Sequence, residues 1–72
     1  MSYNYHAAFQ QPTGYTKQQL EEIAVAACCA YGMEFPDAKD VDVDFYFETK
    51  HVEVTGGPEP RLYSWKQLGF QL

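Results

Sequence analysis

Strict alternation of polar and apolar residues marks the middle of the chain. From residue 40 to residue 48 the sequence runs Asp-Val-Asp-Val-Asp-Phe-Tyr-Phe-Glu. Because successive side chains of a strand point to opposite faces of a sheet, this pattern predicts a β-strand with one buried face. The buried face would carry Val41, Val43, Phe45 and Phe47. The exposed face would carry Asp40, Asp42, Asp44, Tyr46 and Glu48, and would form a flat acidic surface with one aromatic side chain.

After residue 48 the apolar positions change from odd to even numbers. A hairpin that turns at Thr49-Lys50 explains the change, since it pairs Phe47 with Val52 on the inner face. The same register places Tyr46 opposite Glu53, so that Glu53 joins the exposed acidic surface. Thr-Lys is unfavourable in a two-residue turn, and a longer loop in the same register is an alternative.

The region before this strand has the signals of an amphipathic helix. Thr16 and Gln19 match a capping box, and Gly32 follows the last apolar residue, where a C′ glycine commonly ends a helix. The sequence therefore predicts a helix over residues 17–31. Its core-facing stripe, at helical spacing, consists of Leu20, Ile23, Ala24, Ala27, Cys28 and Tyr31.

The opposite side of this helix has no charge beyond Glu22, because its next residues are Val25, Ala26 and Cys29. A small sheet covers only one side of a helix. Two interpretations stay open: the chain's terminal segments cover this side, or a second copy packs there and makes a homodimer with these small residues at its seam.

The two ends of the chain are less distinctive. Residues 1–13 predict either an edge strand, from alternation over residues 3–10, or a mobile arm. After the connector at residues 56–60, Arg61 to Trp65 predicts a third antiparallel strand, while Ser64 and Gln67 alternatively cap a helical turn that ends at Gly69. The expected fold is α+β, a single small domain over residues 1–72 with one α-helix packed on a three- or four-stranded antiparallel sheet.

The charge of the chain is unevenly distributed. Residues 34–53 hold seven acids and two bases, and their net charge of −5 equals that of the whole chain. This excess disfavours direct contact with nucleic-acid phosphates and with anionic membranes. No apolar run approaches the roughly 20 residues that span a bilayer. The N-terminal residues have no basic region and no apolar region, so we expect them not to be a signal peptide. These features lead us to expect a cytoplasmic protein.

No pattern indicates catalysis or a cofactor. The spacing of Asp40, Asp42 and Asp44 is like the start of a calcium loop, but Phe45 and His51 stand where that loop needs a glycine and a bidentate acid. Cys28 and Cys29 are adjacent, too close for an unstrained disulfide, so we expect two buried free thiols. The sequence predicts no metal site, no cofactor and no enzymatic activity.

An acidic surface with an aromatic side chain suits docking on a basic surface of a larger protein. The docking residues would be Asp40, Asp42, Asp44, Tyr46, Glu48 and Glu53. In length, acidity and lack of motifs the chain resembles small inhibitors encoded by phages and other mobile elements, among them anti-restriction, anti-CRISPR and host-takeover proteins, some of which mimic DNA. The resemblance is to a kind of protein and not to a family.

Two alternatives remain open at this point. The chain could be a small structural or assembly component that works as a homo-oligomer through its helix. The acids could instead only solvate an exposed strand and prevent edge-to-edge aggregation.

Overall fold

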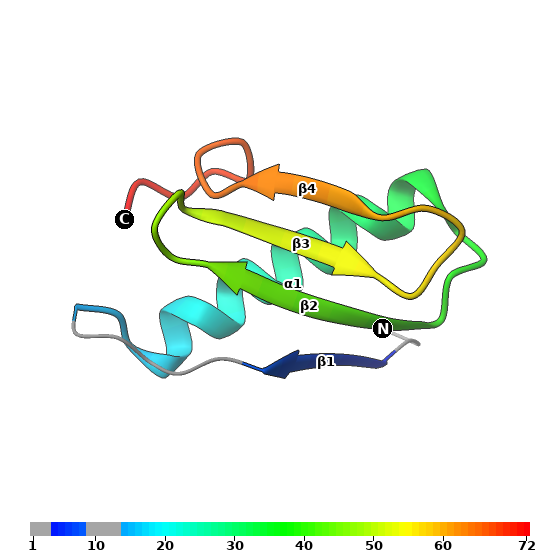
Figure 1. The fold of residues 1–72 in the computed structure, drawn as a ribbon, viewed down its shortest axis with the longest axis horizontal. Coiled ribbons are helices and arrows are strands. Elements are labelled where there is room, and N and C mark those ends of the chain that lie inside the picture. Colours follow the sequence, from blue (N-terminus) through cyan, green and yellow to red (C-terminus); the bar gives the residue numbers. More distant parts are fainter. Residues whose placement is uncertain (1–3, 9–13) are drawn as a thin grey trace.

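The computed structural model describes residues 14–72 and the backbone of residues 4–8. Its elements follow the order β1 (Asn4–Ala8), α1 (Lys17–Glu34), β2 (Asp40–Tyr46), β3 (His51–Thr55) and β4 (Arg61–Ser64). The strands form one sheet in the order β1-β2-β3-β4, and α1 lies along one face of it (Figure 1). The predicted α+β class, with one helix on an antiparallel sheet of β2, β3 and β4, is confirmed.

The first strand adds a parallel pair to this antiparallel sheet. Its backbone pairs with β2 in parallel, with Asn4 opposite Asp40. The connectivity explains the direction, because α1 carries the chain back along the sheet before β2 begins, as a parallel pair requires. The acidic strand β2 is therefore an inner strand with a neighbour on each side. Tyr3, Phe9 and Gln10, part of the predicted alternation, lie outside the described residues.

The helix begins where the sequence predicts and ends later. The Gln19 N–H donates to Thr16 Oγ1 at 3.0 Å, and the Thr16 N–H donates to Gln19 Oε1 at 2.9 Å, which completes the capping box. The predicted end at Gly32 is wrong, because the helix continues to Glu34. Contacts from β4 hold this last turn: Arg61 Nε lies 3.1 Å from Glu34 Oε1 and Tyr63 Oη donates to Glu34 Oε2 at 3.2 Å.

The register of the β2–β3 hairpin also differs from the prediction. Phe45 lies opposite Val52 and Tyr46 opposite His51, so the strands are displaced by two residues. The connection is a loop over residues 47–50. A two-residue turn of the favoured type needs positive φ at one or both central residues, and here Lys50 is the one non-glycine residue of the described chain with positive φ. Because the displacement is even, each side chain keeps its predicted face.

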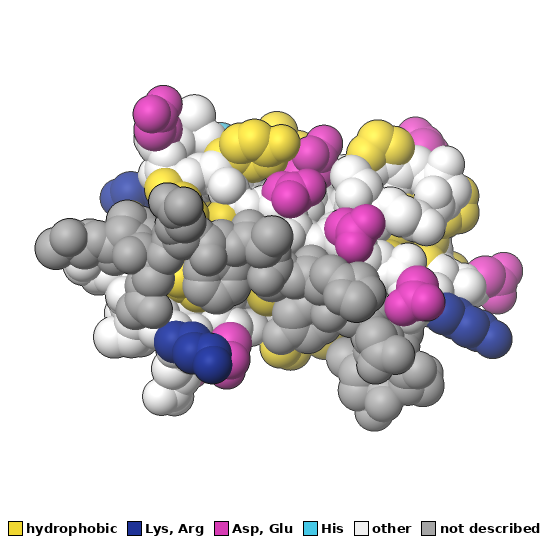
Figure 2. All heavy atoms as spheres, turned by 60° about the horizontal axis from the view of Figure 1, so that its bottom comes forward, with side chains coloured by type: hydrophobic (Ala, Val, Ile, Leu, Met, Phe, Trp, Pro, Cys, Tyr) yellow, Lys and Arg dark blue, Asp and Glu magenta, His cyan; other side chains and the backbone are white. Residues whose placement is uncertain are grey.

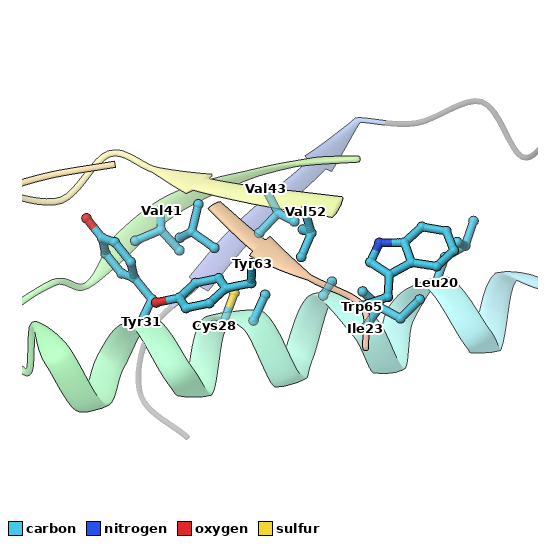
Figure 3. Close-up of a cluster of buried hydrophobic side chains, with 12 residues drawn as sticks. Leu20, Ile23, Cys28, Tyr31, Val41, Val43, Val52, Tyr63 and Trp65 are labelled. Carbon is cyan, nitrogen blue, oxygen red and sulfur yellow. The ribbon is translucent and has the colours of Figure 1, made fainter. Parts of the chain in front are cut away.

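The core lies between α1 and the inner face of the sheet. Its buried side chains are Leu20, Ile23, Ala24, Ala27, Cys28, Tyr31, Val41, Val43, Val52, Val54, Tyr63 and Trp65. All six residues of the predicted helix stripe are among them. Figure 3 shows the valines of β2 and β3 facing α1, with Trp65 near Leu20 at one end.

Two aromatic residues predicted for the buried face lie at its rim. Phe45 and Phe47 are only half-buried, with their rings stacked at a centroid distance of 5.8 Å. Phe47 also meets Trp65 edge-on at 6.0 Å. Phe47 belongs to the loop and not to β2, because the strand ends at Tyr46.

The C-terminal segment combines both predicted alternatives. β4 ends at Ser64, whose hydroxyl accepts a hydrogen bond from the Gln67 N–H at 3.0 Å. This bond caps a turn that runs to Gly69, where φ is +95°. The tail then packs back on the core through Phe70 and Leu72.

Candidate functional site

The aspartates of β2 form a regular row on the sheet face opposite α1. Asp40, Asp42 and Asp44 are exposed, while Val41 and Val43 between them are buried. Neighbouring side chains on one face of a strand lie roughly 7 Å apart, so the row presents evenly spaced negative charges. Figure 2, seen from the side of the β1 edge, shows acidic side chains (magenta) following one another across the molecule, with uncharged and hydrophobic surface between them.

The position of β2 inside the sheet rules out one explanation for its aspartates, the protection of a sheet edge. Charged side chains protect edge strands from pairing with other molecules. β2 is paired with β1 on one side and β3 on the other. Edge protection therefore does not explain the aspartates. Within the described residues none of the three forms an ion pair, so no base among those residues neutralises their charges.

Tyr46 and Glu53 extend the row toward β3. Tyr46 lies opposite His51 but reaches diagonally, and its hydroxyl donates to Glu53 Oε1 at 2.9 Å. This hydrogen bond, with the negative charge of Glu53 behind it, raises the pKa of Tyr46 above its usual value. The Tyr46 hydroxyl thus stays protonated and holds the carboxylate, while 46% of the residue is exposed. We call Asp40, Asp42, Asp44, Tyr46 and Glu53 the acidic face.

Glu48 adjoins the acidic face, since it lines one hollow together with Tyr46. It is exposed, but it lies in the loop between β2 and β3, whereas the sequence predicted it on the strand. The displaced hairpin register is the reason, because it ends β2 two residues before Glu48.

A shallow hollow of about 210 Å³ adjoins the acidic face. It is lined by Tyr46, Thr49, His51, Glu53 and Leu62. Leu62 of β4 lies opposite Glu53 and is 57% exposed, which makes it the apolar wall of the hollow. The sequence analysis missed Leu62 as a surface residue. The signal was its position next to Tyr63, since adjacent residues of a strand point to opposite faces.

The predicted oligomer seam is accessible on the outer side of α1. Val25 and Cys29 are exposed and Ala26 is half-buried. Val25 and Ala26 line a hollow of about 460 Å³, and Met33, 85% exposed, continues the apolar stripe.

The two cysteines differ in environment. The expectation of two buried thiols is wrong for Cys29, because adjacent residues of a helix point in different directions and Cys29 faces outward. Both are free. The pKa of Cys28 is raised to about 11, mainly by burial and to a smaller extent by the charge interaction with Cys29. Cys28 is therefore a protonated core side chain at neutral pH.

A second charged cluster joins the end of α1 to β4. Arg61 Nη1 lies 3.1 Å from Glu59 Oε1, and its Nε bonds Glu34. The guanidinium carbon also lies 5.1 Å from the centroid of the Phe35 ring. This cluster holds an arginine between carboxylates and an aromatic ring, and all its charges come from the chain itself.

In the part of the chain that the structure describes, no group of three or more His, Cys, Asp or Glu side chains is placed to hold a metal ion. No helix of that part is both long and apolar enough to cross a membrane.

No protein-family model matches this chain, and no curated protein or solved structure matches it either.

Proposed function

We propose that this chain is a non-catalytic inhibitor that docks its acidic face on a basic surface of a larger protein and blocks it. Such surfaces commonly bind nucleic acid, so the inhibitor would act as a mimic of negatively charged DNA. The proposal extends to its origin and place of action: a phage- or mobile-element-encoded protein of the anti-restriction, anti-CRISPR or host-takeover kind, in the cytoplasm of a bacterial host.

The observation that carries the proposal is the aspartate row on an inner strand. Asp40, Asp42 and Asp44 are exposed, regularly spaced and without an ion pair among the described residues. A purely solvated face needs no such uniform sign, because interspersed lysines solvate a surface equally well. Concentrated charge of one sign instead accelerates association with a partner of opposite charge.

Tyr46 and Leu62 add apolar contact area, which the charged side chains alone do not provide. Interfaces draw most of their binding energy from a few central side chains, often aromatic, that become desolvated. Tyr46 and Leu62 are the exposed large apolar residues on the outer sheet face of the described chain. They lie on either side of Glu53, so an aromatic and an aliphatic contact are available beside the acidic row.

The test is capture of partners from a bacterial lysate at low salt, followed by elution at high salt. Three forms of the chain are compared: wild type, the double variant Asp42→Lys/Asp44→Lys, and the matched control Glu21→Lys/Glu22→Lys on α1. Both variants change the net charge equally, and all four substituted side chains are exposed. We expect one protein to be retained by wild type and by the control and lost by the Asp42→Lys/Asp44→Lys variant.

Retention of the same protein by all three forms would contradict docking through the acidic face. Loss with both double variants would mean that only total charge matters. Circular dichroism spectra of the variants should match wild type, since no substituted side chain is buried.

A second candidate function, a helix-mediated homo-oligomer, has a separate observation in its favour. The exposed stripe of Val25, Cys29 and Met33 and the hollow beside Val25 and Ala26 offer an apolar surface on α1. Sedimentation equilibrium distinguishes the two. Self-association that Val25→Glu abolishes would favour the oligomer, whereas a monomer at all concentrations would remove it.

A further inference from the structure

We propose that the hollow beside Glu53 is a binding site for one arginine side chain of the partner. The inference rests on the proposed function, because it names the chemistry that the acidic face recognises at its centre. The hollow differs from the aspartate row in that it combines a fixed carboxylate, an aromatic ring and an aliphatic wall.

The carboxylate of Glu53 is the fixed element. It is half-buried, and the Tyr46 hydroxyl donates to its Oε1 at 2.9 Å. A carboxylate has about four acceptor positions, so this one hydrogen bond orients the group and leaves capacity for further donors. Within the described residues Glu53 forms no ion pair. A cationic donor from outside therefore meets an oriented and uncompensated negative charge.

The walls of the hollow favour a guanidinium over an ammonium group. Tyr46 lines the hollow with a partly exposed aromatic side chain and Leu62 with an exposed aliphatic one. An arginine lays its methylene stem on apolar surface, stacks its planar head on a ring and donates to a carboxylate in a fork. Lysine has a compact and strongly hydrated charge, and gains less from the ring and the wall.

Elsewhere in this chain, an arginine of its own binds between an aromatic ring and a carboxylate. Arg61 lies over the Phe35 ring and bonds the Glu34 carboxylate. The hollow repeats the ring and the carboxylate through Tyr46 and Glu53, with no arginine or lysine among its lining residues. Its one histidine, His51, is hydrogen-bonded through Nδ1 to the Thr49 carbonyl at 2.8 Å. Of the other bases, Lys50 is engaged elsewhere, since its Nζ donates to the Leu72 carbonyl at 2.6 Å.

The experiment compares two peptides of equal length and charge, one of alternating glycine and arginine and one of alternating glycine and lysine. Each is titrated at low ionic strength into the ¹⁵N-labelled full chain, and amide shifts give the site and the dissociation constant. We expect the arginine peptide to bind about two- to fivefold more tightly, the worth of an exposed cation–π contact. The largest shifts should fall on residues 46, 53 and 62.

Three variants assign the preference to the hollow. Glu53→Gln keeps the shape and removes the charge, and should abolish the preference for arginine. Asp42→Asn removes one charge outside the hollow, and should weaken both peptides by the same factor. Tyr46→Phe keeps the ring but frees the carboxylate, and should reduce the preference only in part. Spectra of the three variants without peptide check that each is folded.

The outcomes separate this inference from the proposed function. Equal binding of both peptides, with Glu53→Gln behaving like Asp42→Asn, would overturn the arginine site and leave docking through the acidic face standing. No binding of either peptide would contradict both.

Discussion

Gly57 allows a close approach between the β3–β4 connection and Tyr31 of the helix, and its substitution gives a sharp test of the packing. A Cβ added at Gly57 would overlap the Tyr31 hydroxyl and lie 2.7 Å from Cε2 and 2.9 Å from Cζ of the same ring. Tyr31 is 1% exposed, and its hydroxyl donates to the Glu59 carbonyl. The ring therefore has no free space into which it can move without breaking that bond.

Three contributions determine how much Gly57→Ala changes the free energy of unfolding. Overpacking costs about 1–3 kcal/mol, and loss of the Tyr31 hydrogen bond costs about 1 kcal/mol. Replacing glycine restricts the unfolded chain and offsets about 0.4–1 kcal/mol. We expect Gly57→Ala to lower the free energy of unfolding by about 1–3 kcal/mol. In a domain of this size that lowers the melting temperature by roughly 5–20 °C.

Thermal unfolding followed by circular dichroism measures the effect, and a double-mutant cycle assigns its cause. Tyr31→Phe removes the hydroxyl that the new methyl group would meet first. It should therefore cost less in the Gly57→Ala background than in wild type, with a coupling of at least about 0.5 kcal/mol. A Gly57→Ala protein that melts like wild type, or two effects that simply add, would refute the reasoning.

Three further predictions concern the helix. Thr16→Ala removes the acceptor of the capping box and should lower the free energy of unfolding by about 1 kcal/mol, measured by denaturant titration; an unchanged midpoint would mean that the cap contributes nothing. A thiol reagent at mildly alkaline pH should label exposed Cys29 quickly and buried Cys28 slowly. Because burial raises the pKa of Cys28 from 9.0 to about 11, its stabilising contribution is complete below pH 9 and is lost as pH rises to about 11. The free energy of unfolding should fall by about 2–3 kcal/mol over that interval, and Cys28→Ala, which removes the thiol, should show a smaller fall.

The elements that depend on neighbouring residues were predictable from the sequence. The Thr16–Gln19 cap forms between residues three positions apart, and the stripe from Leu20 to Tyr31 follows from helical period. The alternation in β2 fixed which side chains are buried, because one-residue shifts would expose the valines. The aspartate row was predictable for the same reason.

The elements that depend on contacts between distant segments were not predictable. The helix runs past Gly32 because Arg61 and Tyr63, far along the chain, bind Glu34. The hairpin register moved by two residues, which alternation cannot detect since both registers keep the same faces. That displacement removed Glu48 from the strand.

The hollow also arose from tertiary contacts. It depends on the pairing of β3 with β4, which brings Leu62 opposite Glu53. The pattern of residues along one strand does not show which residues of another strand will lie beside it. The same holds for the parallel pairing of β1, which places the acidic strand inside the sheet.

The central claim is that the acidic face binds a basic partner mainly through its charge. The most direct measurement is a calorimetric titration of the captured partner with wild type and with Asp42→Lys/Asp44→Lys, each at low and at moderate salt. We expect the double reversal to weaken binding by about 100-fold at low salt. Salt near 0.1 M, where charges are screened beyond about 10 Å, should weaken wild-type binding. Equal affinity of the two proteins at both salt concentrations would contradict the claim.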